Sequence, residues 1–435
     1  MNKIPRNILI ITVVIALLTS ISNYSSSSEN IDDLAYVMAV AIDVGTTAKY
    51  KISLQLSTIE SSATEAIIKP KESSEDSSGG GQESNGDSAS SESQSSSNTS
   101  EIFTIECNSL DSAIIIANTF LNKDITLSHC KVLIISEEQA RKNISQIINN
   151  LINKVEVRPD CNIIISSISD NEFNSSNKPK LENLISKYYD LTSNSETITA
   201  YNQEVELTDF YSSLEDSLMQ PYAGLGIISN TSKNSYIDKS NSSLDAQAQS
   251  LINYSSQYAV NTIGLAVFKD DKMVGTLSGI ETMCHLLIIN KFNSCILDIP
   301  NPLNSDETIS LYLYSAENTK NQVSIVNSSP FVKTKINLSA KILSSNNNDE
   351  ALTQENLTLI QDTASKYITE QIYNYFNKTS KEFQSDIAGL GRFAIKNFKT
   401  TNEWRDYNWL ENYQNSTFKV DLKLSIRTGI LLTTE

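Results

Sequence analysis

The chain has one long apolar segment, and that segment lies at the very start. Ile8 to Leu18 is apolar apart from Thr12, and it follows a short stretch that carries Lys3 and Arg6. A basic start followed by an apolar run is typical of an export signal. No later stretch reaches the roughly 18 continuous apolar residues that indicate a membrane-spanning helix. We therefore expect everything after about residue 29 to fold in water, outside the cell membrane.

The fate of residues 1–28 stays open between a cleaved signal and a retained membrane anchor. A helix of about eleven residues spans about 16 Å, whereas the hydrocarbon core of a bilayer is roughly 30 Å thick. That length favours cleavage, and Ser20 and Ser22 place small residues at the spacing that a signal peptidase recognises. An uncleaved, tilted anchor is the alternative.

Composition limits what the folded part can be. The 435 residues exceed one ordinary core, and about 150 residues per domain predict two or three domains. A hydrophobic content of 39% excludes a polytopic membrane protein. With 34 basic and 51 acidic side chains the net charge is -17, which argues against nucleic acid because phosphate binding needs a basic face.

A polar tract at residues 72–100 interrupts the first part of the folded chain. Its 29 residues include six acids, no base and Ala89 as the one hydrophobic side chain, so the tract cannot form a core. Residues 51–59 before it and 102–106 after it have the pattern of strands. We interpret the tract as a disordered insertion at a strand-to-strand turn, with a wall-spanning stalk as the alternative.

Cysteines and histidines give no sign of a metal site. Only His129 and His285 exist, and no two cysteines have the Cys-x-x-Cys spacing of a zinc site or a redox dithiol. An odd cysteine count also fits poorly with a disulfide scaffold, although one or two bridges remain open. The five cysteines are Cys107, Cys130, Cys161, Cys284 and Cys295.

Short strands alternate with helices in the first half of the chain. Alternating apolar and polar residues predict strands, and apolar residues three and four apart predict helices. The expected strands are 51–59, 102–106, 131–135 and 162–168, and the expected helices are 109–121, 137–155, 180–189 and 207–219. Residues 31–42 are expected to form a short buried element, either a strand or a helix followed by a strand. This order predicts an α/β or α+β fold.

The second half repeats such units. A break is expected at 220–224, a hairpin over 262–277, a helix from a capping box at 278–281 to about 289, strands at 309–315, 322–326, 332–342 and 418–426, and a long helix near 354–384. We therefore expect three consecutive domains, each a mixed sheet packed with helices. Their predicted limits are 29–195, 196–300 and 301–435.

Searches for catalytic chemistry find no site. There is no Gly-x-Ser-x-Gly elbow, and the Ser-x-x-Lys match at 175–178 is expected by chance in so Ser- and Lys-rich a chain. The glycines at 81–86 lack the Lys of a phosphate loop, and those at 224–226 and 389–391 are expected to form turns. We predict no catalytic, cofactor-binding or metal-binding residue, and hence a binding or assembly protein that is not an enzyme.

Several sequence blocks, taken in order, resemble the Ger(x)C family, the C subunits of spore germinant receptors. The blocks are 32–35 running into 41–43, 128–134, 264–275 with Glu281-Thr282, 386–391, Trp404 with Trp409, and 426–429. The resemblance implies a three-domain α/β protein on the outer side of the spore's inner membrane. It further implies partnership with a membrane A subunit and a transporter-like B subunit in sensing small nutrient germinants. Neither the germinant nor direct ligand binding by this chain follows from the resemblance.

One feature departs from the family. Its members usually carry a lipobox cysteine directly after the apolar segment, whereas the first cysteine here is Cys107. Thioether lipidation needs that sulfur, so the resemblance leaves a retained anchor, attachment through the partner subunits, or release. The Ser-rich tract also departs from the family pattern.

Structural roles are expected for the prominent residues of the matching blocks. We expect close backbone approach at Gly264 and Gly275, a solvated turn at Asp270-Asp271, a cap at Glu281, the end of the long helix at Asp386, and burial of Trp404 and Trp409. Two other functions stay open. A secreted solute-binding protein would have a deep cleft between domains, and an envelope hydrolase would gather titratable groups in one pocket.

Overall fold

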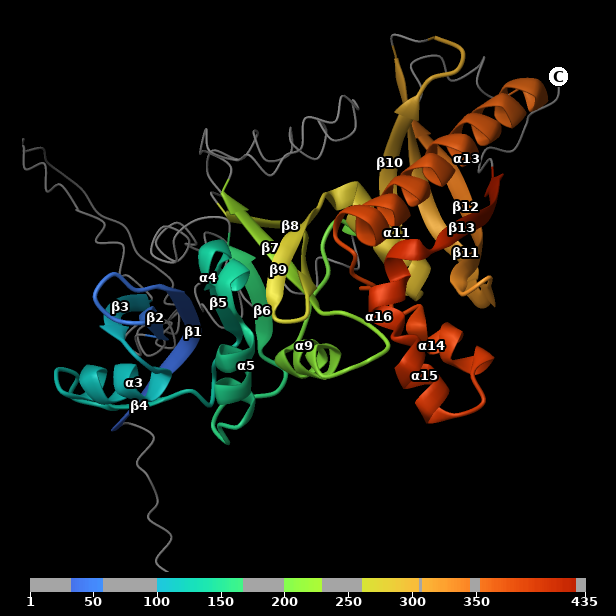
Figure 1. Ribbon diagram of the computed structural model, residues 1–435. Helices are drawn as coiled ribbons and strands as arrows, with labels where there is room; N and C mark the ends of the chain where they lie inside the picture. The colour runs from blue at the N-terminus through green and yellow to red at the C-terminus, as the bar shows by residue number, and fades with distance from the viewer. Residues whose placement is uncertain are drawn as a thin grey trace, which may run out of the picture.

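Two β-sheets, each packed with helices, make up the described part of the chain (Figure 1). The structure is a computed structural model that describes residues 33–57, 100–166, 199–228, 260–304, 307–344 and 353–427. None of the helices in these ranges is both long enough and apolar enough to cross a membrane. The predicted α/β (α+β) class is confirmed.

The first sheet has nine strands in the order β3-β2-β1-β5-β6-β7-β8-β9, with β4 beside β1. Strands β1, β5, β6 and β7 are mutually parallel, and the pairs at both ends are antiparallel. All five residues of β5 are buried, as expected of a central parallel strand that is covered on both faces. The strands are β1 (Leu34–Val44), β2 (Tyr50–Ser57), β3 (Ser100–Cys107), β4 (Asp124–Thr126), β5 (Val132–Ser136), β6 (Asn162–Ser166), β7 (Tyr222–Ile228), β8 (Val260–Lys269) and β9 (Lys272–Leu277).

The polar tract connects two neighbouring strands of this sheet, as predicted. β2 and β3 are antiparallel, and Ser57 at the end of β2 pairs with Ser100 at the start of β3. The chain between them therefore leaves and re-enters the sheet at one point. Residues 72–99 themselves, like the predicted helix at 180–189 and residues 1–28, lie outside the described residues.

Helices from the first half of the described chain accompany this sheet, and one predicted helix proves to be two. They are α3 (Leu110–Asn118), α4 (Glu137–Lys142), α5 (Ser145–Ile152) and α9 (Leu207–Leu214). The single helix predicted at 137–155 is broken because Asn143 is extended, with φ of -173°. There the buried Ile144 donates its backbone N–H to the carbonyl oxygen of Asp271 at 3.0 Å. A contact 127 residues away along the sequence thus ends α4.

The second sheet has four strands in the order β10-β11-β12-β13, and the long helix α13 (Gln354–Asn377) lies along it (Figure 1). A π-helical turn at Lys378–Glu382 continues α13, so the long helix predicted near 354–384 is confirmed. The strands predicted at 309–315 and 322–326 form one strand, because bulges near Glu317 bend it without ending it. The strands are β10 (Ser294–Pro300), which the sequence did not predict, β11 (Thr308–Val326), β12 (Ser329–Ser344) and β13 (Thr417–Ile426).

The hairpin and the capped helix that follows it are as predicted. β8 and β9 are antiparallel, and Asp270 adopts a positive φ of 55° in the turn. Helix α11 (Gly279–Ile289) begins with the predicted capping box, in which Ser278 accepts the N–H of Glu281 and Glu281 accepts the N–H of Ser278. A set of short helices lies between α13 and β13: α14 (Gly391–Ala394), α15 (Thr401–Tyr407) and α16 (Trp409–Asn412).

The glycines of this region lie where another atom approaches closely. A Cβ on Gly264, which has φ of +90°, would lie 2.3 Å from the carbonyl oxygen of Leu277. A Cβ on Gly275 would lie 2.2 Å from the ring of Phe383. The segment Gly224-Leu225-Gly226, predicted as a turn, instead lies inside β7, where it pairs with β6 and β8.

The β8-β9 hairpin of the first sheet contributes side chains to two apolar cores, one on each of its faces. Leu265 and Val267 of β8 belong to the apolar cluster that includes α11, α13 and the second sheet. Ala266 and Phe268 belong to the cluster that includes β1, β2, β5 and β6. The nine-stranded sheet thus extends past the limit predicted at residue 195. The division into three domains stays a prediction.

Adding a methyl group at Gly275 is expected to destabilise the fold. Gly275→Ala should lower the free energy of unfolding by about 2 kcal/mol, because the buried ring of Phe383 must move. Urea unfolding measures the effect. Gly224→Ala is the matched control, since its Cβ would have an ordinary contact at 3.4 Å, and it should cost less than about 1 kcal/mol. Adding Phe383→Leu to Gly275→Ala should recover part of the loss, and equal losses for both alanine variants would contradict this explanation.

Candidate functional site

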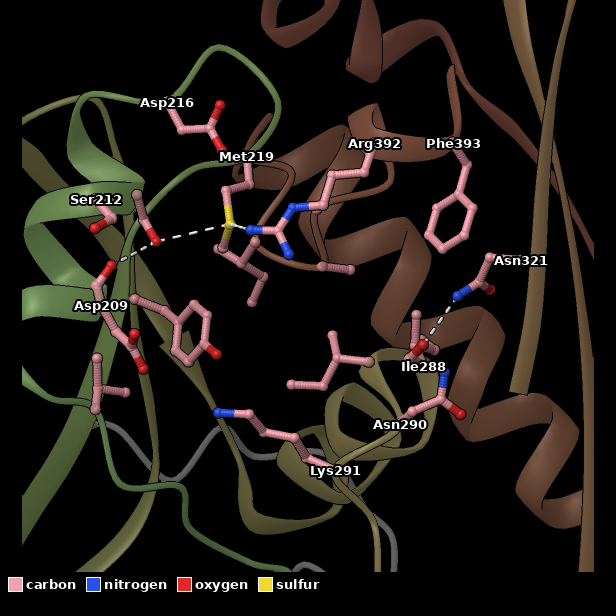
Figure 2. A pocket seen from close by; sticks show the side chains of 17 residues that line it. Asp209, Ser212, Asp216, Met219, Ile288, Asn290, Lys291, Asn321, Arg392 and Phe393 are labelled. Carbon is pink, nitrogen blue, oxygen red and sulfur yellow. Dashed lines mark hydrogen bonds between the residues drawn. The ribbon is translucent and has the colours of Figure 1, made fainter. Parts of the chain in front are cut away.

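A cleft of about 360 Å³ lies where the two sheets meet (Figure 2). One wall is α9 with the loop that follows it, the second is the end of α11, and the third is the segment from Ile387 to Phe393. Apolar side chains from Tyr222, Ile288 and Phe393 form part of the lining. The cleft is therefore built from three segments that are far apart in the sequence.

Charges of both signs line the cleft. Asp209 and Asp216 lie on the α9 side, whereas Lys291 lies at the end of α11 and Arg392 in α14. None of these four side chains forms an ion pair with another described residue. A small polar molecule with both charges would find a partner for each on facing walls.

The end of α11 is fixed by an asparagine. Asn290 has a left-handed backbone with φ of 64°, a conformation that Asn tolerates better than most residues. Its side chain donates to the carbonyl oxygen of Thr319 at 3.1 Å, and the amide of Asn321 donates to the carbonyl oxygen of Ile288 at 2.9 Å. These bonds tie the helix end to β11 and place Lys291 at the rim of the cleft.

The opposite wall is held by a buried carboxylate. Asp386 accepts the indole N–H of Trp409 at 2.8 Å and the backbone N–H of Gly391 at 3.0 Å. Gly389 between them has φ of +66°, which favours glycine. The prediction that Asp386 ends the long helix is wrong, because the helix ends before it and Asp386 is fully buried as the anchor of the segment that carries Arg392.

Burial dominates the electrostatics of Asp386. Loss of solvation raises its pKa to about 6, against the lowering by the hydrogen bonds from Trp409 and from the backbone of Leu390, Gly391 and Gly389. Its Oδ1 atom has no hydrogen-bond partner among the described residues. A buried, incompletely paired carboxylate costs stability when it is charged.

The two histidines have structural surroundings and lie apart. His285 is fully buried, and its Nδ1 lies 2.9 Å from the hydroxyl of Tyr375. Burial, with the positive charge of Lys291, lowers its pKa to about 3, so the ring is neutral. His129 lies in the turn before β5, and its Nδ1 atom is 3.0 Å from the hydroxyl oxygen of Ser128. Neither histidine lines the cleft, so the serines there have no histidine base beside them.

The five cysteines are buried free thiols. Cys130 and Cys161 lie closest, with their sulfur atoms 3.8 Å apart. Burial raises the pKa of the Cys284 thiol, which keeps it protonated. In the described ranges no three His, Cys, Asp or Glu side chains are arranged to hold a metal ion.

Sequence reasoning singled out one residue that lines the cleft and one that supports it, but none of its charged residues. Gly389 and Trp409 were singled out, and Trp404 and Trp409 are buried as predicted. Asp209, Lys291 and Arg392 carried no signal, because each is an ordinary surface charge in its own segment. Only the tertiary arrangement brings them to one cleft.

Two family models match most of the chain. Residues 27–226 match "Spore germination protein N-terminal domain", and residues 263–429 match "Spore germination B3/ GerAC like, C-terminal". The crystal structure of the GerBC protein is similar in fold, with a TM-score of 0.50 and 14% sequence identity, over 89% of this chain and 96% of that chain. No curated protein matches the chain in sequence.

Neutralising Asp386 should change how stability depends on pH. Because the folded-state pKa is raised from 3.8 to about 6, the carboxyl stabilises the fold below about pH 4, and this contribution is lost as the pH rises through 6. Asp386→Asn has no such loss, so it should gain up to about 3 kcal/mol relative to the wild type between pH 4 and pH 7.

The measurement is urea unfolding of both proteins at several pH values. Taking the difference between variant and wild type cancels other groups, His285 included. Asp386→Ala is the control for the hydrogen bonds, and it should lose about 1–3 kcal/mol because the N–H groups of Trp409 and Gly391 lose their acceptor. A difference between Asp386→Asn and wild type that stays constant over this pH range would contradict the assignment.

Proposed function

The chain belongs to the Ger(x)C family of spore germination proteins, and on that basis we propose that it is the C subunit of a nutrient germinant receptor. In this proposal it acts without catalysis, beside a membrane A subunit and a transporter-like B subunit. Its place is the outer face of the spore's inner membrane. The observation that carries the proposal is the match of both family models, in order, to the two halves of the chain.

The architecture is consistent with a subunit that transmits a signal by its shape. Both apolar cores include residues of the β8-β9 hairpin. A movement of one sheet therefore displaces side chains that pack against the other. Lys378 and Glu281 add an ion pair of 2.9 Å between the end of α13 and the start of α11, with both side chains largely buried. A partner that binds either half can therefore act on the cleft between them.

Membrane attachment in this proposal does not use a lipid on cysteine. The first cysteine is Cys107, which is buried in the sheet and far from the apolar segment in sequence. Attachment then depends on residues 1–28 or on the A and B subunits.

The cleft favours a second candidate function, direct binding of a small solute in the cell envelope. Its position between the two sheets and its charges of both signs, Asp209 on α9 and Arg392 on α14, are what such a protein requires. This function is compatible with a receptor subunit, and it would also describe a secreted solute-binding protein.

Co-purification tests the receptor assignment. The full chain, affinity-tagged at its C-terminus and extracted from spore membranes in mild detergent, should bring down the A and B subunits. Untagged spores extracted in parallel control for nonspecific capture, and mass spectrometry identifies the recovered chains. Elution of the tagged chain alone would contradict the assignment.

Thermal unfolding tests solute binding. Small zwitterions should raise the Tm of the purified protein as their concentration rises, and analogues that lack either charge should raise it less. Arg392→Gln with Asp209→Asn should abolish the shift, because both facing charges are lost. Arg405→Gln with Asp406→Asn, an exposed pair outside the cleft, is the matched control. Equal shifts in both double variants would exclude the cleft as the binding site.

A further inference from the structure

Helix α3 exposes an apolar face. Ile115 and Ile116 are 68% and 41% exposed, although the opposite face of the helix is buried in the first core through Leu110 and Ala113. Phe120, in the turn just after the helix, is 54% exposed on one side and contacts the ring of Phe103 on the other. The turn that carries Phe120 closes directly on the helix, because the N–H groups of Phe120 and Leu121 both bond to the carbonyl oxygen of Ala117. Exposed apolar side chains gathered on one element, unlike scattered ones, indicate an interaction surface.

A fourth exposed side chain extends this face. Val155 is fully exposed just after α5, and its neighbour Lys154 forms an ion pair with Asp111 at the start of α3. In the described residues before 200, these four are the exposed large hydrophobic side chains. We call Ile115, Ile116, Phe120 and Val155 the α3 face.

The α3 face lies where the N-terminal segment joins the fold. β1 begins at Leu34, which pairs with Asp124 in β4. The next β4 residue, Ile125, donates its backbone N–H to the side chain of Asn118 at the end of α3, at 3.2 Å. Figure 1 shows α3, β4 and the start of β1 together at one end of the molecule. The described chain therefore begins beside this face, and the long apolar segment, residues 8–18, precedes that point in the sequence.

We propose that the α3 face rests in the surface of a lipid bilayer, beside the point where residues 8–18 enter the same bilayer. This inference rests on the membrane location within the proposed function. The tether between Leu18 and Leu34 reaches at most about 58 Å when fully extended, which holds the face at high local concentration next to the lipid. An apolar segment too short for easy spanning gains from a second contact, because stable membrane binding generally takes two signals.

The local charges favour apolar contact with lipid over electrostatic binding to an anionic surface or to a charged partner. Asp111 is neutralised by Lys154, and Asp124 adjoins Lys123, so no basic cluster accompanies the α3 face. The whole chain carries a net charge of -17, which repels acidic headgroups. Binding should therefore depend on apolar insertion and should be at least as strong with neutral phosphatidylcholine as with acidic lipids.

Fluorescence quenching by brominated lipid tests the contact directly. The two native tryptophans, Trp404 and Trp409, are 6% and 1% exposed and lie in the C-terminal helices, so they give a background that lipid does not reach. Full-length Phe120→Trp, bound to phosphatidylcholine vesicles, should lose the emission that the substitution adds when the acyl chains carry bromine. Val326→Trp, at a site 53% exposed in the second sheet, is the matched control and should keep its emission.

Two outcomes of this experiment would overturn the proposal. One is that vesicle flotation shows the chain bound while bromine leaves the Phe120→Trp emission unchanged. The other is that the full chain does not bind vesicles at all. Either result leaves the receptor assignment standing if the A and B subunits still co-purify.

A serine triple variant supplies the second measurement. Ile115→Ser with Ile116→Ser and Phe120→Ser should weaken vesicle partitioning roughly tenfold or more, because the exposed face loses its apolar groups. Serine at Ile296, Val326 and Leu343, which are similarly exposed on the second sheet, should leave partitioning unchanged. If the α3 variant kept full partitioning but lost the A and B subunits, the face would be a protein contact and the lipid proposal would fail.

Discussion

The alternation of side chains along β8 is the constraint on which the rest of the structure depends. Successive residues of a strand point to opposite faces, so Leu265 and Val267 enter one core while Ala266 and Phe268 enter the other. Each core is thereby completed by the same hairpin. α11, buried along nearly its whole length, follows directly and fixes the second sheet against the first. The two halves cannot separate without exposing the face of β8 that carries Leu265 and Val267.

The segment between α13 and α14 uses this junction to build the cleft. Ser385 donates to the carbonyl oxygen of Phe268 at 2.6 Å, and Gln220 donates its N–H to the carbonyl oxygen of Asp386 at 2.8 Å. Both bonds join the C-terminal segment to the hairpin region. Asp386 then orients Gly391 and the charged wall next to it, at the cost of burying a carboxylate. A site placed on such a joint is sensitive to any partner that moves one sheet relative to the other.

Local patterns predicted most of the elements that depend on local forces. The β8-β9 hairpin, the Ser278 capping box and the long α13 were all predicted, because turn residues, caps and apolar periodicity act within a few residues. The errors arose where distant segments intervene. Asp271 ends a helix at Asn143, and two neighbouring strands take up Gly224 as part of a sheet, although glycine in sequence indicates a turn. Asp386 was assigned to a helix end because the sequence alone does not reveal its hydrogen-bond donors, Trp409 and Gly391.

The sequence by itself determined the α+β class, the one long apolar segment at residues 8–18, the lack of a cysteine directly after that segment and the family, because these follow from composition, periodicity and ordered blocks along the chain. Only the tertiary structure decided that one hairpin serves two cores, that Asp209 and Arg392 line one cleft from different segments, and that α3 leaves apolar side chains exposed near the start of β1. The reason is physical. Burial and charge pairing depend on which distant segments come to lie together, and a local pattern records only that a face is apolar, not what covers it.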